Sequence, residues 1–151
     1  MIRPALPSEA QLVRELSAEA YLPAYLSLFG RAPMPAIEDY APRIARGEVW
    51  LCEIDNQAAA VLVLETKPSH LLVYSIAIRP ACQGRGLAAE LLAFADARAK
   101  QMGFADIRLY TNEKMLRNLR IYRKAGYREI GRRPHPSIPG LELIDMAKAL
   151  D

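Results

Sequence analysis

Apolar residues recur at helical spacing in some parts of the chain and run together, as in β-strands, in others. A short N-terminal strand (IRPAL) is followed by Ser8, which can cap a helix with Leu12, Val13 and Leu16 on one face. We expect a second helical stretch up to Gly30. Three prolines within residues 31–42 then predict an irregular segment that leads into a short helix around residues 40–45.

The middle and C-terminal parts of the chain alternate between strand-like and helix-like patterns. EVWLCEI and AAAVLVLE flank the polar turn DNQ and predict a β-hairpin. LLVYSIAI at residues 71–78 is apolar nearly throughout, which indicates a central strand. A helix over residues 86–102 ends at Gly103, and a strand (DIRLYT), a helix over 115–125 and two strands (YREIG and LELIDMAKAL) follow. This order predicts a mixed α/β fold.

Composition fits one compact domain covering residues 1–151, with 52% hydrophobic and 25% charged residues. No apolar stretch reaches about 18 residues, and the N-terminus lacks a charged start followed by an apolar run. We therefore expect a cytoplasmic protein with no membrane partner. Cys52 and Cys82 have no metal-type spacing, so we expect two unpaired thiols and no metal site.

The stretch RPACQGRGLAAELL joins the central strand to the long helix and contains Gly84, Arg85 and Gly86. Glycines let a loop turn tightly with its N–H groups pointing inward, and a helix N-terminus adds unpaired donors and partial positive charge. Phosphates bind at such places. A plain strand-to-helix connection is the alternative. The loop lacks a Gly-Lys-Ser/Thr sequence and the G-x-G-x-x-G pattern, which argues against nucleoside triphosphates and dinucleotides.

QGRGLA at residues 83–88 resembles the Gln/Arg-x-x-Gly-x-Gly/Ala signature of the GNAT superfamily of acetyl-CoA-dependent N-acetyltransferases. YSIAIRP, the helix that follows, DIRLYT and the Y-x-x-x-G-Y sequence at residues 122–127 are similar to that family's cofactor-binding core in order and spacing, over residues 71–133. The resemblance implies the GNAT fold, an α/β (α+β) architecture with a mixed, mostly antiparallel sheet and about four flanking helices. We predict that the sheet splays between strands four and five, at residues 71–78 and 106–111.

The resemblance implies acetyl-CoA as co-substrate, and it assigns two parts of its binding site. The pyrophosphate would lie on the backbone N–H groups of the loop residues Gln83, Gly84, Arg85, Gly86, Leu87 and Ala88. The pantetheine arm would lie beside Ile76, Ala77 and Ile78. A peptide-like arm can pair with unpaired strand backbone as an added strand does, and the side chains of these three residues are ordinary core.

Tyr122 occupies a position where the family often has a tyrosine that acts as general acid, and its phenol could protonate the departing thiolate. Ordinary pKa values of about 10 for a phenol and about 8.5 for a thiol are close enough for this transfer. A packing tyrosine is the alternative. Asn118, one turn earlier, would face the cofactor. The family more often has a small residue there and an asparagine three positions before it, where this chain has Met115.

A general base is not evident, because the strand at residues 71–78 contains no carboxylate. Tyr74, Ser75 and Glu113 are the candidates, and a weakly basic amine needs little help. His135 lies in the loop before the last strand. The family resemblance places that loop near the acceptor, whereas an ordinary surface loop is the simpler interpretation.

A cluster of basic residues against one acid, Glu129, has three interpretations. It consists of Lys114, Arg117, Arg120, Arg123, Lys124, Arg128, Arg132 and Arg133. A solvated helix face comes first, and contact with the 3′-phosphate end of the cofactor comes second. No aromatic interleaving or docking motif accompanies the cluster, so we expect no nucleic-acid partner.

These features together predict an enzyme that transfers acetyl from acetyl-CoA to a primary amine by direct attack in a ternary complex. The acceptor is a small-molecule amine or a protein amine, either a lysine or an N-terminus. A protein acceptor needs an open groove where residues 31–40 would otherwise cover the pocket. A catalytically silent acyl-CoA-binding regulatory module is the alternative from another functional class. A homodimer is compatible with both the enzyme and this module.

Overall fold

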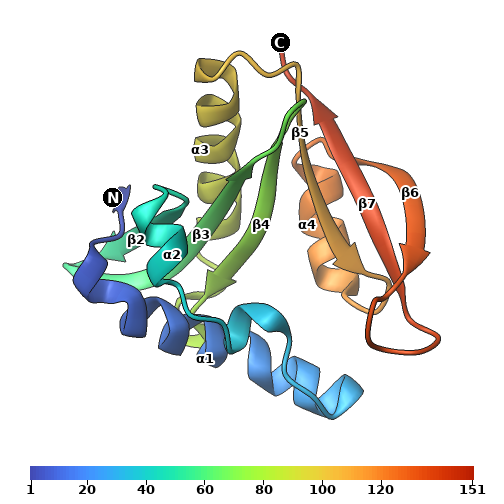
Figure 1. Cartoon of the computed structure of the whole chain (residues 1–151), viewed down its shortest axis with the longest axis horizontal. Coiled ribbons are helices and arrows are strands. Elements are labelled where there is room, and N and C mark those ends of the chain that lie inside the picture. Colours follow the sequence, from blue (N-terminus) through green and yellow to red (C-terminus); the bar gives the residue numbers. More distant parts are fainter. The chain divides into compact units, whose positions relative to one another are not determined.

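The computed structural model describes residues 1–151, which form seven strands and four α-helices (Figure 1). The strands are β1 (Ile2–Pro4), β2 (Val49–Ile54), β3 (Gln57–Thr66), β4 (Leu71–Ile78), β5 (Asp106–Asn112), β6 (Arg128–Pro134) and β7 (Glu142–Ala149). The helices are α1 (Ala10–Phe29), α2 (Ala41–Ala45), α3 (Leu87–Gln101) and α4 (Leu116–Lys124). No helix combines the length and apolar character needed to cross a membrane. The predicted order of elements is confirmed from β2 onward.

The strands follow the order β1-β2-β3-β4-β5-β7-β6, and the chain divides into two compact units. The first unit contains residues 1–64 and 75–87, and the second contains residues 65–74 and 88–151. β4 passes from one to the other, because its first four residues belong to the second unit and its last four to the first.

The first unit is built on an antiparallel arrangement of β1, β2 and β3. The β2–β3 turn contains Asp55 and Asn56, whose φ values are 51° and 64°. Both residues are in the left-handed region, which short polar side chains tolerate better than others do. The hairpin therefore forms without a glycine. Its strands supply buried residues, including Leu51 and Leu62, and α1 supplies Val13 and Leu16.

α1 differs from the prediction of two helical stretches with Ser8 as cap. It is one helix from Ala10 to Phe29 with Pro23 inside it. Pro23 lacks an N–H and loses one intrahelical hydrogen bond, but it is exposed, and packing elsewhere on the helix keeps it continuous. Ser8 lies in a 3₁₀ turn, where the Glu9 carboxylate accepts a hydrogen bond from the Leu6 N–H at 2.8 Å. The cap predicted at Ser8 is wrong.

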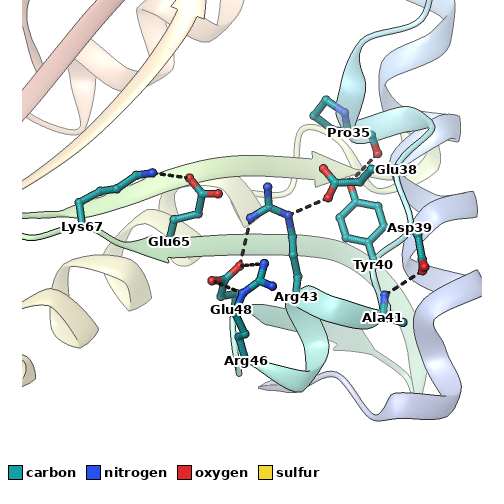
Figure 2. A network of polar contacts seen from close by, with 10 residues as sticks. All are labelled: Pro35, Glu38, Asp39, Tyr40, Ala41, Arg43, Arg46, Glu48, Glu65 and Lys67. Atoms are coloured by element: carbon teal, nitrogen blue, oxygen red, sulfur yellow. Dashed lines mark hydrogen bonds and ion pairs between the residues drawn. The ribbon is translucent and has the colours of Figure 1, made fainter.

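The segment between α1 and β2 is irregular, as predicted, and polar contacts fix it (Figure 2). Arg43 on α2 pairs with Glu38 at 2.8 Å and with Glu48 at 3.1 Å. The Tyr40 hydroxyl donates to the Pro35 carbonyl, and burial raises the pKa of Tyr40 to about 12. The short helix α2 therefore sits in a network that the proline-rich sequence alone does not reveal.

The second unit contains the only parallel pair, β4 with β5. Leu71, Leu72 and Val73 pair with Ile107, Arg108 and Leu109, and the register ends there although both strands continue. β5 and β7 pair antiparallel over the whole length of β5, and β6 pairs antiparallel with β7. The predicted mixed, mostly antiparallel sheet that splays between its fourth and fifth strands is thus confirmed.

Helix α3 supplies much of the buried surface of the second unit. Leu91, Ala95 and Ala99 recur at the spacing of one helix face, and all are fully buried. Asp96, beside them, pairs with Lys148 of β7. The aliphatic stem of Lys148 lies 3.2 Å from the position that a Cβ on Gly126 would occupy. A charged pair and a glycine therefore fix how α3, β7 and the end of α4 meet.

The Arg3–Glu9 ion pair of the first unit predicts a pH-dependent stability. Arg3, with its hydrogen bonds at 2.8 Å, lowers the pKa of Glu9 from 4.5 to about 2. A depressed folded-state pKa contributes stability above the unfolded value, and this contribution is lost as pH falls from 4.5 toward 2. We expect the difference in free energy of unfolding between the parent and Glu9→Gln to be constant near neutral pH and to vanish across that window.

Urea unfolding at several pH values measures this difference. Glu15→Gln removes the same charge from the exposed face of α1 without breaking an ion pair, and it serves as the control. If the difference in unfolding free energy between the parent and Glu9→Gln persisted unchanged at pH 2, the lowered pKa of Glu9 would be contradicted.

Candidate functional site

The loop that joins β4 to α3 has a backbone that requires glycine at two positions. Gly84 has φ +80° and Gly86 has φ +79°, both in the left-handed region. No heavy atom lies within 4 Å of the position that a Cβ would occupy on either residue. The glycines are therefore needed for the backbone conformation, and they leave open space above the loop. Arg85 between them is exposed.

Arg79 fixes the start of this loop. Its N–H donates to the Ala59 carbonyl of β3 at 2.9 Å, and its Nε donates to the Ala58 carbonyl at 2.7 Å. Nη1 pairs with Glu19 of α1 at 2.6 Å. One side chain thus connects the loop to β3 and to α1, a role that the sequence analysis missed.

The loop continues directly into the N-terminal turn of α3. Leu87 is the first residue of the helix and is buried, whereas Ala88 is half-buried. The first N–H groups of a helix have no partner inside it, and the helix dipole adds partial positive charge there. Together with Arg85, this turn is a suitable site for an anion such as a phosphate.

The last residues of β4 direct half of their backbone groups away from β3. Since the Arg79 N–H faces β3, the alternation along a strand turns the backbone of Ile78 and Ile76 to the other edge. The Ile76 carbonyl accepts a hydrogen bond from the Tyr21 hydroxyl at 2.9 Å. The Ile78 carbonyl receives a longer contact, 3.4 Å, from Gln83 Nε2. Ala77 is buried.

Tyr21 of α1 is a second residue that the sequence analysis missed. Besides the Ile76 carbonyl, its hydroxyl contacts Ser75 Oγ at 2.9 Å. Tyr21 has a single hydroxyl proton and donates it to the carbonyl, so Ser75 donates to Tyr21. Ser75 is buried, and this contact satisfies it. No local pattern could have found a contact between residues 54 positions apart.

Tyr122 and Asn118 lie one turn apart on α4 in the second unit, and both are half-buried. The Tyr122 ring meets the ring of Tyr127 edge to face, with centroids 6.2 Å apart. Burial raises the pKa of Tyr127 above its ordinary value, and its hydroxyl has no hydrogen-bond partner. Met115, where the family resemblance led us to look for asparagine, precedes the helix and makes no side-chain cap.

The other candidates separate into those with a structural role and those on the surface. Two backbone N–H groups, of Ser137 and Ile138, donate to His135 Nδ1 at 3.1 and 3.0 Å. This nitrogen is therefore unprotonated and is used by its own loop, which supports the structural interpretation of His135. Tyr74 and Glu113 are half-buried. Arg117, Arg120 and Arg123 of the basic cluster are all exposed, as a solvated helix face would be.

The predicted site residues are divided between the two units. The first unit brings together Ile76–Ile78 and the loop from Gln83 to Leu87. The second unit contains Ala88, Asn118 and Tyr122. Within the first unit, the strand end, the loop and Tyr21 are joined by the hydrogen bonds described above.

Three comparisons with known proteins bear on this arrangement. The model of the acetyltransferase (GNAT) family matches residues 13–127. YvbK, an uncharacterized N-acetyltransferase of Bacillus subtilis (strain 168), is 29% identical over 86 residues, which is 56% of each chain. This chain thus spans about half the length of that curated relative.

Solved structures share the fold, two of them over nearly the whole chain. PaiA N-acetyltransferase from Thermoplasma acidophilum, in complex with coenzyme A, matches with a TM-score of 0.81 and 15% identity, covering 99% of this chain and 98% of that one. The ribosomal-protein-S18-alanine N-acetyltransferase from Escherichia coli matches with a TM-score of 0.78 and 16% identity, covering 100% and 94%. A GNAT family acetyltransferase from Elizabethkingia anophelis with acetyl-CoA bound matches with a TM-score of 0.64 and 20% identity. This match covers 72% of this chain and 80% of that one.

The Tyr21 contact predicts a measurable coupling with Ser75. Tyr21→Phe removes the hydroxyl and leaves buried Ser75 without its acceptor, which should cost about 1–3 kcal/mol of unfolding free energy. Adding Ser75→Ala removes the unsatisfied group. The loss of unfolding free energy in the double variant should therefore be smaller than the sum of the losses in the two single variants. Urea unfolding of all four proteins measures this; additive losses would contradict the coupling.

Proposed function

Since this chain belongs to the acetyltransferase (GNAT) family, we propose that it transfers the acetyl group of acetyl-CoA to a primary amine by direct attack in a ternary complex. The observation that carries the proposal is the open, left-handed glycine loop at Gly84 and Gly86, which continues into the N-terminus of α3. We take residues 1–151 as one domain, because β4 runs through both units.

The loop would bind the pyrophosphate of the co-substrate through its backbone. A Cβ at Gly84 or Gly86 would project into open space, so no side chain of the chain covers the loop at these two positions. The N–H groups from Gly84 to Ala88 and the charge of Arg85 would then face the phosphates, whereas the Gln83 N–H donates to the Pro80 carbonyl at 3.3 Å. Backbone donors in this arrangement need few specific side chains.

The pantetheine arm would pair with the end of β4. The β4–β5 register stops at Val73, so the backbone of Ile76 and Ile78 has no β5 partner. The amides of the arm are peptide-like and can extend the strand at this edge. Tyr21 already bonds the Ile76 carbonyl and Gln83 contacts the Ile78 carbonyl, so we assign the N–H groups of Ile76 and Ile78 to the arm.

Chemistry requires one proton to be removed and one to be supplied. The amine nitrogen attacks the thioester carbonyl, a C–N bond forms, the C–S bond breaks and the sulfur leaves as a thiolate. We assign the proton that the thiolate takes up to the hydroxyl of Tyr122, and Asn118 to a contact with the co-substrate. The attacking amine loses its proton to water or to one of Tyr74, Ser75 and Glu113.

The proposal also covers the class of acceptor, the location of the enzyme and its oligomeric state. We favour a small-molecule amine, and a protein lysine or N-terminal amine is the second candidate. The polar network around Tyr40 and Arg43 favours a small-molecule acceptor. This network fixes residues 31–40, which an open protein-binding groove would displace. We place the enzyme in the cytoplasm, and a homodimer is compatible with this function.

Release of free coenzyme A thiol across a panel of amines tests the proposal. The panel contains polyamines, amino acids, aminoglycosides and peptides, and we expect turnover with at least one class. Tight binding of coenzyme A together with no turnover on any amine would instead favour a regulatory acyl-CoA-binding module.

Gly86→Val should abolish coenzyme A binding while the domain stays folded. Valine tolerates a φ of +79° poorly, and its methyl groups would enter the space above the loop. Gly30→Val is the matched control, because Gly30 also has a positive φ (+66°) and open space around it but lies at the end of α1. Calorimetric titration with coenzyme A should distinguish the two; equal affinity in both would overturn the loop assignment.

Tyr122→Phe should lower single-turnover rates by about 10²–10⁴-fold, the usual contribution of a positioned proton donor. Acetyl-CoA affinity and Tm should stay near those of the parent, because the ring is kept. Tyr127→Phe is the matched control: it removes a neighbouring hydroxyl that is buried without a partner, so turnover and Tm should not fall. Equal turnover in the two variants would show that Tyr122 only packs.

A further inference from the structure

We propose that the second unit carries a separate binding site for a small organic anion with a flat apolar body, such as an aromatic carboxylate. The site is a cavity of about 390 Å³ over one face of the strands β4, β5, β7 and β6. Apart from Arg133, which belongs to the basic cluster considered for the 3′-phosphate, none of its lining residues is among those assigned above to the acetyl-CoA site or to catalysis. The volume lies in the range of small-molecule sites.

A missing side chain creates the hollow. Gly131 of β6 pairs with Asp145 of β7, next to a bulge between Glu129 and Gly131. A Cβ on Gly131 would have no heavy atom within 4 Å, and its φ is not in the left-handed region. The glycine is therefore not required by the backbone, and any larger residue would extend into the cavity.

Apolar side chains contribute to the floor of the cavity. Tyr110 of β5 also pairs with Asp145, so the two share a face of the sheet. Leu72 of β4 pairs with Arg108 and shares that face too. Ile130, 54% exposed, forms the side next to the bulge. An aromatic ring could lie on this surface and cover apolar area that is otherwise in water.

Positive charge predominates around the floor. Lys67, Arg108 and Arg133 line the cavity, and Asp145 is the one carboxylate that does. Arg133 lies over the Tyr110 ring at 4.9 Å and pairs with Asp145 at 2.9 Å, so these two neutralise each other. The charge that remains lies with Arg108 and Lys67, on the other side of Tyr110.

Arg108 and Lys67 have donors to spare. Arg108 contacts a single oxygen of Asp106, and Lys67 pairs with Glu65 at 3.3 Å (Figure 2); both acids lie outside the lining. A guanidinium has five N–H donors and an ammonium three. His70 stands beside them, and burial followed by the charge of Arg108 lowers its pKa. A carboxylate would meet these donors at the end of the apolar floor.

Titration of the protein with 2-naphthoate, followed by amide NMR shifts, tests the proposal. We expect shifts confined to the residues of this cavity, with coenzyme A present at saturation. Gly131→Val, a residue that suits a strand, should weaken binding at least about tenfold while Tm is kept. The neutral analogue 2-naphthamide should bind more weakly than the acid.

A charge-matched pair of variants keeps the test decisive if Gly131→Val is unstable. Arg108→Gln should weaken 2-naphthoate binding about tenfold, which is the loss of affinity expected when one hydrogen bond to a charged group is removed. Arg46→Gln removes the same charge from the surface of the first unit and should have no effect. Equal binding by these two variants, no saturation below about 10 mM, or displacement by coenzyme A would overturn the proposal.

Discussion

The early end of the pairing between β4 and β5 is the constraint on which the candidate site depends. Buried backbone groups must find partners, and a strand in the middle of a sheet normally finds them on both sides. β4 has three paired residues on its β5 side and then continues without that partner. Its remaining groups must bond to side chains, to water or to a ligand. The Tyr21 hydroxyl on the Ile76 carbonyl is one such substitute.

Most of the proposed binding surface is made of backbone, so its formation depends on few specific side chains. Gly84 and Gly86 are needed because their φ values are positive, and the N-terminus of α3 offers donors whatever its side chains are. Arg79 is an exception, since its side chain fixes the loop to two other elements. A structure with 15% identity to this chain shares the fold with a TM-score of 0.81.

Two of the three buried polar side-chain atoms without a hydrogen-bond partner belong to Asp96 and Tyr127 in the second unit, and the third is Ser17 Oγ on α1. Asp96 pairs with Lys148 through one oxygen, while its other oxygen and the Tyr127 hydroxyl are buried without partners. Such groups destabilise a core unless something offsets them. The close packing of Lys148 against Gly126 and of Tyr127 against Tyr122 supplies contacts at the same place.

The sequence by itself determined the succession of elements, because the relevant signals are local. Hydrophobic periodicity located α3, the run at residues 71–78 located β4, and glycines located the ends of α1 and α3. The glycine loop was found for the same reason, since its backbone conformation depends on a few consecutive residues. Local signals were weaker in α1, where Pro23 suggested a break that the packing of the rest of the helix overrides.

Only the tertiary structure decided which distant side chains complete the site. Tyr21 reaches Ser75 across 54 positions, and Glu19 reaches Arg79 across 60. The cavity at Gly131 depends on a bulge opposite Asp145 and on residues from four strands. No periodicity or propensity encodes these contacts, because they form when separate elements pack and each must satisfy its buried polar groups with whatever the neighbouring element presents.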